Sequence, residues 1–223
     1  MHFHLPKPLH GWREFAGEVG IIVVGVLIAL AFDQVVERIR WNQQVHVARA
    51  AIHREMAFDL AEFADRLRVA PCIDRDLAEA QHRIDIVEST GSTPSRAVAA
   101  DSPGRLLLVG DYDAQQSAQN LVHFPASELS ALGLWYDQAR DLKTWDVQED
   151  SVWTNLGLLA PAAAKLGPLD LALLRRDLVT AKELQTLMVI NARREIDRAK
   201  GLGVAPGPSR QDYVRRLCRE TTL

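Results

Sequence analysis

The chain has 223 residues, a net charge of −3 and 48% hydrophobic residues, a balance typical of a folded protein that excludes wholesale disorder. Because no basic excess is present to neutralise phosphates, we expect no nucleic-acid partner. Two cysteines are too few for a disulfide-dense mini-domain or a complete structural zinc site.

An uncharged apolar run near the N-terminus is the strongest feature of the sequence. It covers the fourteen residues Val19–Phe32, and with its flanks the apolar stretch extends over Phe15–Val36. As a helix this stretch is about 33 Å long, against a bilayer core of about 30 Å. Trp12 and Trp41 lie just outside it, as membrane-interface aromatics do. The sequence therefore predicts a transmembrane helix over 12–36.

Two alternatives to a membrane span stay open. The run also resembles the apolar region of a signal peptide, with an A-x-A cleavage site at Ala29–Ala31. Glu14 and Glu18 argue against cleavage, because signal peptides avoid acidic residues at this position. The second alternative is the buried core helix of a soluble protein.

The apolar run contains two pairs of small residues that favour close helix packing in membranes. They are Ala16 with Gly20 and Gly25 with Ala29, each four residues apart. Glu18 places a carboxylate close to the hydrocarbon boundary, where it favours a polar partner. We therefore expect contact with the lipid bilayer and association through this helix, with other membrane proteins or with a second copy of the chain.

The orientation of the predicted span is poorly specified, because basic residues on its two sides nearly balance. Cys72 and Cys218 are candidates for a disulfide that would contribute about 4–5 kcal/mol in the chain-entropy model. Such a bond persists only in an oxidising compartment, and two buried free thiols are the alternative. On this basis we favour a bacterial inner-membrane protein with its main domain in the periplasm.

Helical periodicity continues beyond the span. Apolar residues recur at steps of three and four over Trp41–Leu67, which is typical of an amphipathic helix. No helix breaker separates Phe32 from this stretch, so the membrane helix is expected to continue into it. Glu55, Asp59 and Glu62 fall between the apolar positions and are assigned to the solvent-facing surface.

Pro71 is expected to stop or kink this helix, and a further helix is predicted over Ile73–Glu88. The stretch 89–113 is rich in Ser, Pro, Gly and Ala and is predicted to be irregular. Two more long amphipathic stretches follow Pro125 and Pro168, and no strand or internal repeat is predicted.

The predicted fold class is all-α, an N-terminal transmembrane helix continuing into a soluble helical bundle of three to four long helices. The predicted organisation is a tail at 1–11, a transmembrane helix at 12–36, membrane-proximal helices at 37–88, an irregular loop at 89–113, a helical bundle at 114–201 and a C-terminal linker with a short basic segment at 202–223.

Motifs of catalysis and cofactor binding are absent from the sequence. It contains no G-x-S-x-G, G-x-G-x-x-G, Walker A or H-E-x-x-H pattern. We therefore predict no catalytic, cofactor-binding or metal-ligating residue, and no enzymatic activity. Trp135, Tyr136, Trp145 and Trp153 are the candidates for a ligand or partner surface, with plain core packing as the alternative.

The N-terminal stretch resembles a group of uncharacterised bacterial proteins that open with W-x-E-F-x-x-E-V-G-I-I-V-x-G-V-L-I-A-L. The match is close over Trp12–Leu30 and looser through Pro71, Cys72 and the later helices. A more distant similarity links it to bacteroidete proteins with a G-E-I-x-L-V-V-I-G-I-L-I-A-L segment. The resemblance implies a single-pass membrane protein with a helical domain, and it implies no activity, substrate or site residue.

These observations together predict a scaffold or accessory subunit of a membrane protein complex. The alternative is a periplasmic sensor whose helical bundle binds a small ligand beside its aromatic residues.

Overall fold

The computed structural model of the protein describes residues 11–92, 101–159 and 166–218, and the predicted tail falls outside this part except for Gly11. The described residues form five α-helices, two short 3-10 helices and no strand, which confirms the all-α class. The elements are α1 (Trp12–Thr90), α2 (Gly110–Ser117), η1 (Asn120–His123), α3 (Ala126–Leu156), η2 (Gly157–Leu159), α4 (Pro168–Gly201) and α5 (Gln211–Leu217).

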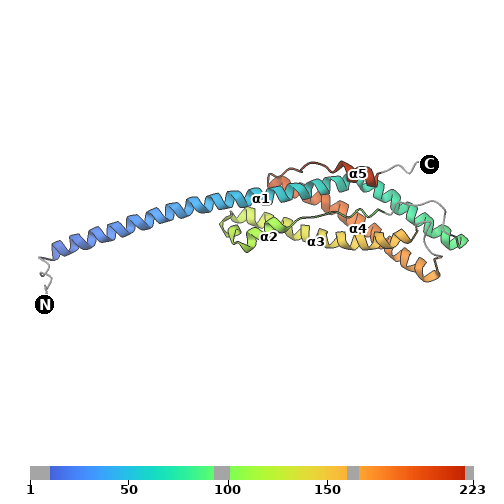
Figure 1. The fold of residues 1–223 in the computed structure, drawn as a ribbon, viewed down its shortest axis with the longest axis horizontal. Coiled ribbons are helices and arrows are strands. Elements are labelled where there is room, and N and C mark those ends of the chain that lie inside the picture. The colour runs from blue at the N-terminus through green and yellow to red at the C-terminus, as the bar shows by residue number, and fades with distance from the viewer. Residues whose placement is uncertain (1–10, 93–100, 160–165, 219–223) are drawn as a thin grey trace, which may run out of the picture. The chain divides into compact units, whose positions relative to one another are not determined.

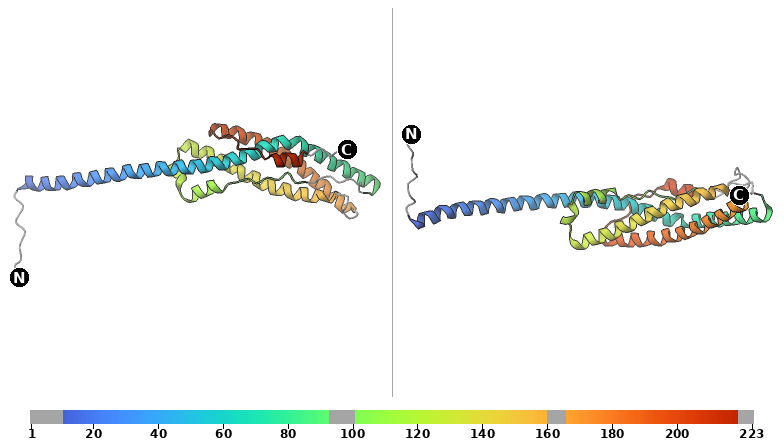
Figure 2. Two further views of the ribbon diagram at one scale, coloured as in Figure 1. Left: turned by 45° about the horizontal axis from the view of Figure 1, so that its top comes forward. Right: turned by 90° about the horizontal axis from the view of Figure 1, so that it is seen from below.

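The chain divides into two units, Met1–Val47 and Ala48–Leu223, which are described separately. The described part of the first unit is almost entirely the N-terminal portion of α1. The second unit contains the rest of α1 and every other helix. There α3 and α4 lie along α1 as the three long helices of a bundle (Figure 1), and two further views show the same arrangement (Figure 2).

The two later helices of the bundle form where the sequence predicts them. In α3 the buried residues follow steps of three and four, from Leu132 through Ala139 to Val152, so one face of the helix meets the core. α4 begins at Pro168, whose fixed φ suits a first helical position. The Asp170 carboxylate accepts a hydrogen bond from the Gly167 amide at 2.8 Å and satisfies a donor at the start of this helix.

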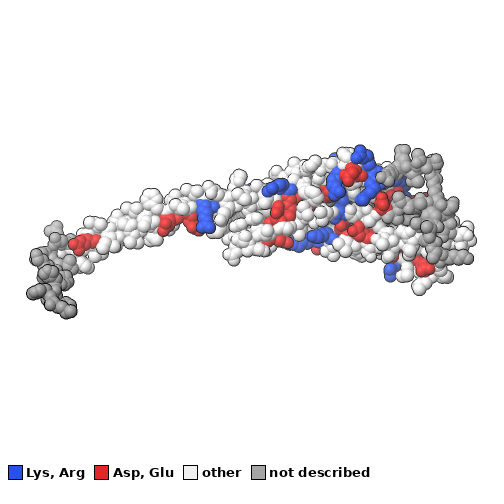
Figure 3. Space-filling view, in the orientation of Figure 1, with Lys and Arg blue, Asp and Glu red and all other residues white. Residues whose placement is uncertain are grey.

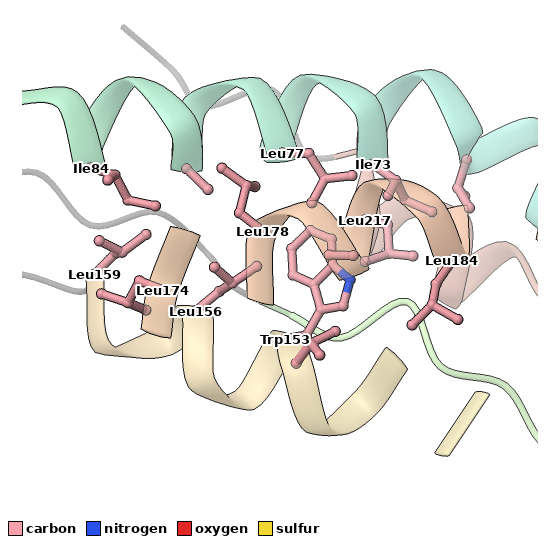
Figure 4. Close-up of a cluster of buried hydrophobic side chains, with 14 of the residues drawn as sticks. Ile73, Leu77, Ile84, Trp153, Leu156, Leu159, Leu174, Leu178, Leu184 and Leu217 are labelled. Carbon is pink, nitrogen blue, oxygen red and sulfur yellow. The ribbon is translucent and has the colours of Figure 1, made fainter. Parts of the chain in front are cut away.

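A core of apolar side chains joins four helices of the second unit. Figure 4 shows residues of α1, α3, α4 and α5 directed into it, with the Trp153 ring between the helices. The cluster takes Ile73, Leu77 and Ile84 from α1 and Leu217 from α5. Side chains of this kind contribute about 1.5–3 kcal/mol each when fully buried. The short C-terminal helix is therefore an integral part of the bundle.

Of the two outcomes expected at Pro71, a stop or a kink, the stop is wrong, because α1 runs through this residue to Thr90 as one helix of 79 residues. A proline inside a helix removes one amide donor and costs about 3 kcal/mol or more. Contacts from α4 support the backbone here. The buried Gln185 amide donates hydrogen bonds to the Ala70 carbonyl at 3.2 Å and to the Asp74 carboxylate at 3.0 Å. These contacts attach α4 to the helix on both sides of Pro71.

The predicted loop 89–113 is shorter than expected. Its first residues end α1 at Thr90, and α2 begins at Gly110 rather than at residue 114. Residues 93–100 lie outside the described part, and the remainder of the loop is the 101–109 segment, which has no regular structure. The C-terminal linker contains a second irregular stretch, the 204–210 segment. Both segments lie against α1 through hydrogen bonds described below.

Candidate functional site

The first unit exposes an apolar surface. Every large apolar side chain from Val19 to Ile39 is solvent-accessible, from 39% at Val19 to 76% at Ile21. One helix among the described residues, α1, is long and apolar enough to cross a membrane, and none of its most apolar window is buried. Figure 3 shows this surface as almost free of charged side chains. An exposed apolar surface of this extent is typical of a membrane or protein contact.

The small-residue pairs of the apolar helix lie on opposite faces. At about 100° of rotation per residue, Gly25 and Ala29 lie within about 20° of Glu18 around the helix axis, and Asp33 lies about 60° away. These four residues form what we call the acid face. Ala16 and Gly20 lie about 160–200° from Glu18. One helix therefore offers two separate faces for close packing, and only one of them carries carboxylates.

The two carboxylates of the acid face are about 22 Å apart along the helix, less than the thickness of a bilayer core of about 30 Å. If the apolar run is centred in the bilayer, each carboxylate lies about 4 Å inside the hydrocarbon boundary. Glu18 is long enough to reach the headgroups, whereas Asp33 has one methylene and reaches less far. Acidic groups at such depths favour a hydrogen-bonding or cationic partner.

The four candidate aromatic residues of the second unit do not form a surface. Trp135 and Tyr136 are fully buried, and the Tyr136 ring stacks on Tyr112 with their centroids 4.1 Å apart. Trp153 is 2% exposed inside the core cluster, and Trp145 packs against that cluster. The core alternative is therefore correct for these residues. The helical spacing of these aromatic residues is as consistent with burial in the core as with a ligand or partner site.

A groove between α1 and α4 contains none of these aromatic residues. It has a volume of about 430 Å³ and a mixed polar and apolar lining. Its walls carry one carboxylate and one ammonium group, and Lys182 Nζ donates a hydrogen bond to Gln81 Oε1 at 3.3 Å. The lining residues are Asp74, Leu77, Ala78, Gln81, Lys182 and Thr186.

A row of buried carboxylates runs along α1 in the second unit. Glu55, Asp59, Glu62 and Asp65, called here the acidic row, follow steps of four, three and three residues and are all at most 6% exposed. The assignment of the first three to the solvent-facing surface was wrong. The physical reason is that α1 is enclosed at this level, by the other long helices and by the two irregular segments.

The acidic row binds the backbone of the 101–109 segment and the start of α2. The Asp59 carboxylate accepts a hydrogen bond from the Leu108 amide at 2.9 Å, and Glu55 accepts one from the Asp111 amide at 2.7 Å. The Arg105 guanidinium pairs with Glu62. These contacts give the buried carboxylates of α1 polar partners, and one of them satisfies a backbone amide of the irregular segment.

The C-terminal linker is anchored to the same face of α1. The Asp65 carboxylate accepts hydrogen bonds from Ser209 Oγ at 2.6 Å and from the Arg210 amide at 2.7 Å. Farther along, the Gly207 amide donates to the Ala57 carbonyl at 2.7 Å. A side chain at residue 207 would place its Cβ 3.1 Å from that carbonyl oxygen, so glycine permits the close approach.

One buried ion pair connects all three long helices. The Arg66 guanidinium of α1 donates two hydrogen bonds to the Glu149 carboxylate of α3, at 2.6 and 2.5 Å, and one to Gln185 Oε1 of α4 at 2.7 Å. Arg66 and Glu149 are 3% and 0% exposed. A two-bond pair of this kind fixes the relative rotation of the helices around it.

Burial raises the pKa of several acidic groups in the second unit. It raises the pKa of Asp59 to about 8, with the nearby Glu55 and Glu62 adding to the effect and the Leu108 amide opposing it. It raises the pKa of Asp146 to about 7. Asp59 Oδ2 has no hydrogen-bond partner in the described part of the chain. Near neutral pH the protonated form of Asp59 is therefore favoured.

Cys72 of α1 and Cys218 at the end of α5 form a disulfide, with Cα atoms 5.2 Å apart and a sequence separation of 146. These are the two cysteines that the sequence analysis named as candidates for a disulfide. The bond holds the C-terminal helix against α1 next to the contacts of Asp65. It ties the last described residues of the chain to the middle of its longest helix.

Among the described residues, no three His, Cys, Asp or Glu side chains are grouped so that they could hold a metal ion. Comparison of the chain with protein-family models, with curated proteins and with solved structures finds no match. The resemblance of the N-terminal stretch to a bacterial family therefore stays a prediction.

The features that sequence reasoning missed are the buried charges. Arg66, Glu149 and Asp65 were not singled out, although a signal was present. The acidic row and the apolar stripe of α1 both repeat at helical spacing but on different faces, so together they indicate a helix enclosed on most sides. Acidic residues that repeat at the same helical spacing as a buried stripe, but on another face, are candidates to accept hydrogen bonds from backbone amides packed against the helix.

Proposed function

We propose that the chain is a single-pass bacterial inner-membrane protein with a periplasmic helical domain that acts, without catalysis of its own, as a scaffold or accessory subunit of a membrane protein complex. The observation that carries the proposal is the exposed apolar surface of α1 in the first unit. A bilayer can cover such a surface without leaving backbone polar groups unpaired, because the hydrogen bonds within the helix already pair them.

The disulfide supports the periplasmic location of the second unit. Disulfides persist in the bacterial periplasm and are rare in the cytosol. Cys72 and Cys218 are bonded and connect distant parts of the chain. The basic residues flanking the apolar helix do not decide the orientation, so the redox chemistry of this pair carries the argument.

The acid face supports association within the membrane. It combines two small residues, which let helices approach closely, with two carboxylates that need polar partners in hydrocarbon. An anchor alone needs neither. We therefore assign the acid face to a companion membrane helix that donates hydrogen bonds or a positive charge.

The test is purification of the tagged full-length chain from native membranes in mild detergent, followed by size separation and intact mass with and without reductant. We expect a chain that retains the apolar helix, is lighter by two hydrogens before reduction and migrates with a stoichiometric partner. Recovery as a clean monomer contradicts the complex. A chain that begins at Phe32 shows cleavage after Ala31 and contradicts the membrane anchor.

A matched pair of variants tests the acid face. Gly25→Ile adds bulk next to Glu18 and Asp33, whereas Gly20→Ile adds the same bulk on the opposite face. We expect Gly25→Ile to lose the partner and Gly20→Ile to keep it. Equal retention by both variants would remove the acid face from the proposal and leave the anchor.

A further inference from the structure

Basic side chains gather on one surface of the second unit. Figure 3 shows Lys and Arg concentrated over α5 and the neighbouring part of α1. The exposed basic residues of α5, of the segment before it and of the neighbouring part of α1 are all arginines, although the whole chain carries a net charge of −3. We call them the basic surface, and they are Arg68, Arg75, Arg210, Arg215 and Arg216.

The arginines of the basic surface are only partly compensated. Arg68 pairs with the buried Asp65 at 2.7 Å and Arg75 pairs with Asp76 at 3.2 Å, whereas the nearest carboxylate oxygens to Arg210 are 3.9 Å away. Arg215 and Arg216 are exposed and form no ion pair with a described residue. The surface therefore presents guanidinium groups with free donors to whatever approaches it.

The backbone that carries these arginines is held rigidly. The disulfide attaches the end of the C-terminal helix to α1, and the Asp65 contacts hold the segment that precedes this helix. Tyr213 adds a third anchor, since its hydroxyl donates to the Pro103 carbonyl at 2.8 Å and its ring lies 3.2 Å from the Arg105 guanidinium carbon. A preorganised surface loses little conformational entropy on binding, which favours recognition of a defined partner.

The chemistry of the surface favours a protein partner over a lipid surface. Helices that lie in the membrane interface need an apolar face. Among the described residues, no large apolar side chain of α5, the 204–210 segment or α1 beyond Val47 is exposed. Guanidinium groups match carboxylates through paired hydrogen bonds, and arginine is enriched at protein interfaces.

We propose that the basic surface is the docking site for an Asp- and Glu-rich segment of a companion protein. The inference rests on the proposed function in one respect, that a companion protein exists. It adds the place on the periplasmic domain where that protein is held and the charge that its segment carries.

The experiment measures binding of a fluorescently labelled oligo-glutamate peptide to the full-length protein in phosphatidylcholine nanodiscs. The variant R215Q/R216Q removes two adjacent exposed arginines from the basic surface. The control variant R193Q/R194Q removes two adjacent exposed arginines from α4 and changes the net charge equally. We expect binding to weaken at least about fivefold in the first variant and to stay within about twofold in the control.

Equal weakening in both variants, or no binding by the unaltered protein, overturns the proposal. So does trypsin protection of the basic surface in nanodiscs of phosphatidylglycerol without peptide, because the surface would then belong to a lipid. Failure of the proposed function gives a different result, a clean monomer from native membranes. If a native partner is present but R215Q/R216Q retains it fully, the docking site alone is refuted.

Discussion

The first unit exposes its apolar side chains and carries few charges, whereas the second unit buries carboxylates and guanidinium groups beneath its surface. In the first, Ile21 is 76% exposed. In the second, Asp59, Glu149 and Glu195 are 0% exposed. The same helix, α1, carries both patterns along its length.

The difference shows that the surroundings of a helix determine which types of residue its surface carries. Where lipid is the expected surrounding, the backbone of α1 is self-sufficient and its side chains need only be apolar. Where protein surrounds it, α1 meets two irregular segments whose amides need acceptors, and the acidic row supplies them. Four predictions test this contrast.

The largest expected change is in the location of the protein, because Val24→Arg should lose membrane insertion. A charge at the centre of a membrane helix costs about 2.5–3.5 kcal/mol on insertion scales, and this helix is the only candidate span among the described residues. The matched control is Val47→Arg, an exposed valine outside the apolar run. We expect carbonate extraction to release the first variant and leave the second in the membrane. Full retention of Val24→Arg would contradict a membrane role for the run.

Removal of the disulfide is expected to cost about 4–5 kcal/mol of unfolding free energy, because the bond closes a very long loop. The variant is Cys72→Ala with Cys218→Ala, unfolded by denaturant in mild detergent and followed by the fluorescence of buried Trp135 and Trp153. Reductant should lower the midpoint of the unaltered protein similarly and leave the variant unchanged. A reduced protein with an unchanged midpoint would show that packing alone holds α5.

Breaking the buried ion pair is expected to cost about 3–5 kcal/mol. Glu149→Leu leaves the Arg66 charge buried without its carboxylate. The control is Glu88→Leu, which removes one of the two carboxylate partners of Arg175 at the exposed surface and should leave the free energy of unfolding nearly unchanged. Replacing both Arg66 and Glu149 by apolar residues should recover much of the loss. A small cost for Glu149→Leu would mean that water reaches this pair.

The sequence predicts the apolar part of this architecture well and its polar part poorly. The stripes of α3 and α4 follow from local periodicity, so Leu132 and Leu178 were expected on buried faces and are buried there. The acidic row depends on amides that are about 50 to 145 residues away, such as those of Leu108 and Arg210. The helical spacing of the row indicates burial, but no local pattern identifies these distant partners.

The two parts of the candidate site also differ in how far the sequence predicts them. The exposed apolar helix and its small residues can be found from composition alone, because a membrane contact needs no partner within the chain. The basic surface cannot, since Arg68 and Arg215 come together only when the C-terminal segment lies on α1. The cysteines were the one local sign that these two regions meet.

The smallest expected effect is a dependence of stability on pH. Asp59 has a folded-state pKa of about 8, above its value of about 3.9 in an unfolded chain. Between these values the folded state holds a proton that the unfolded state releases, so rising pH favours unfolding. We expect the melting temperature, followed by near-UV circular dichroism, to fall by a few degrees between pH 6 and pH 8.5. Asp59→Asn should flatten this slope, since the amide keeps an oxygen for the Leu108 amide and cannot ionise.

The slope, rather than the melting temperature itself, is the informative quantity, because the new amide adds donors that shift stability at every pH. Asp141→Asn is the matched control, an exposed carboxylate on α3 whose replacement should leave the slope unchanged. Asp146→Asn should flatten the slope at lower pH, since the pKa of Asp146 is about 7. An unchanged slope in Asp59→Asn would mean that Asp59 is ionised within the bundle. The acidic row would then hold the 101–109 segment by charge, and the buried arginines would be its counterions.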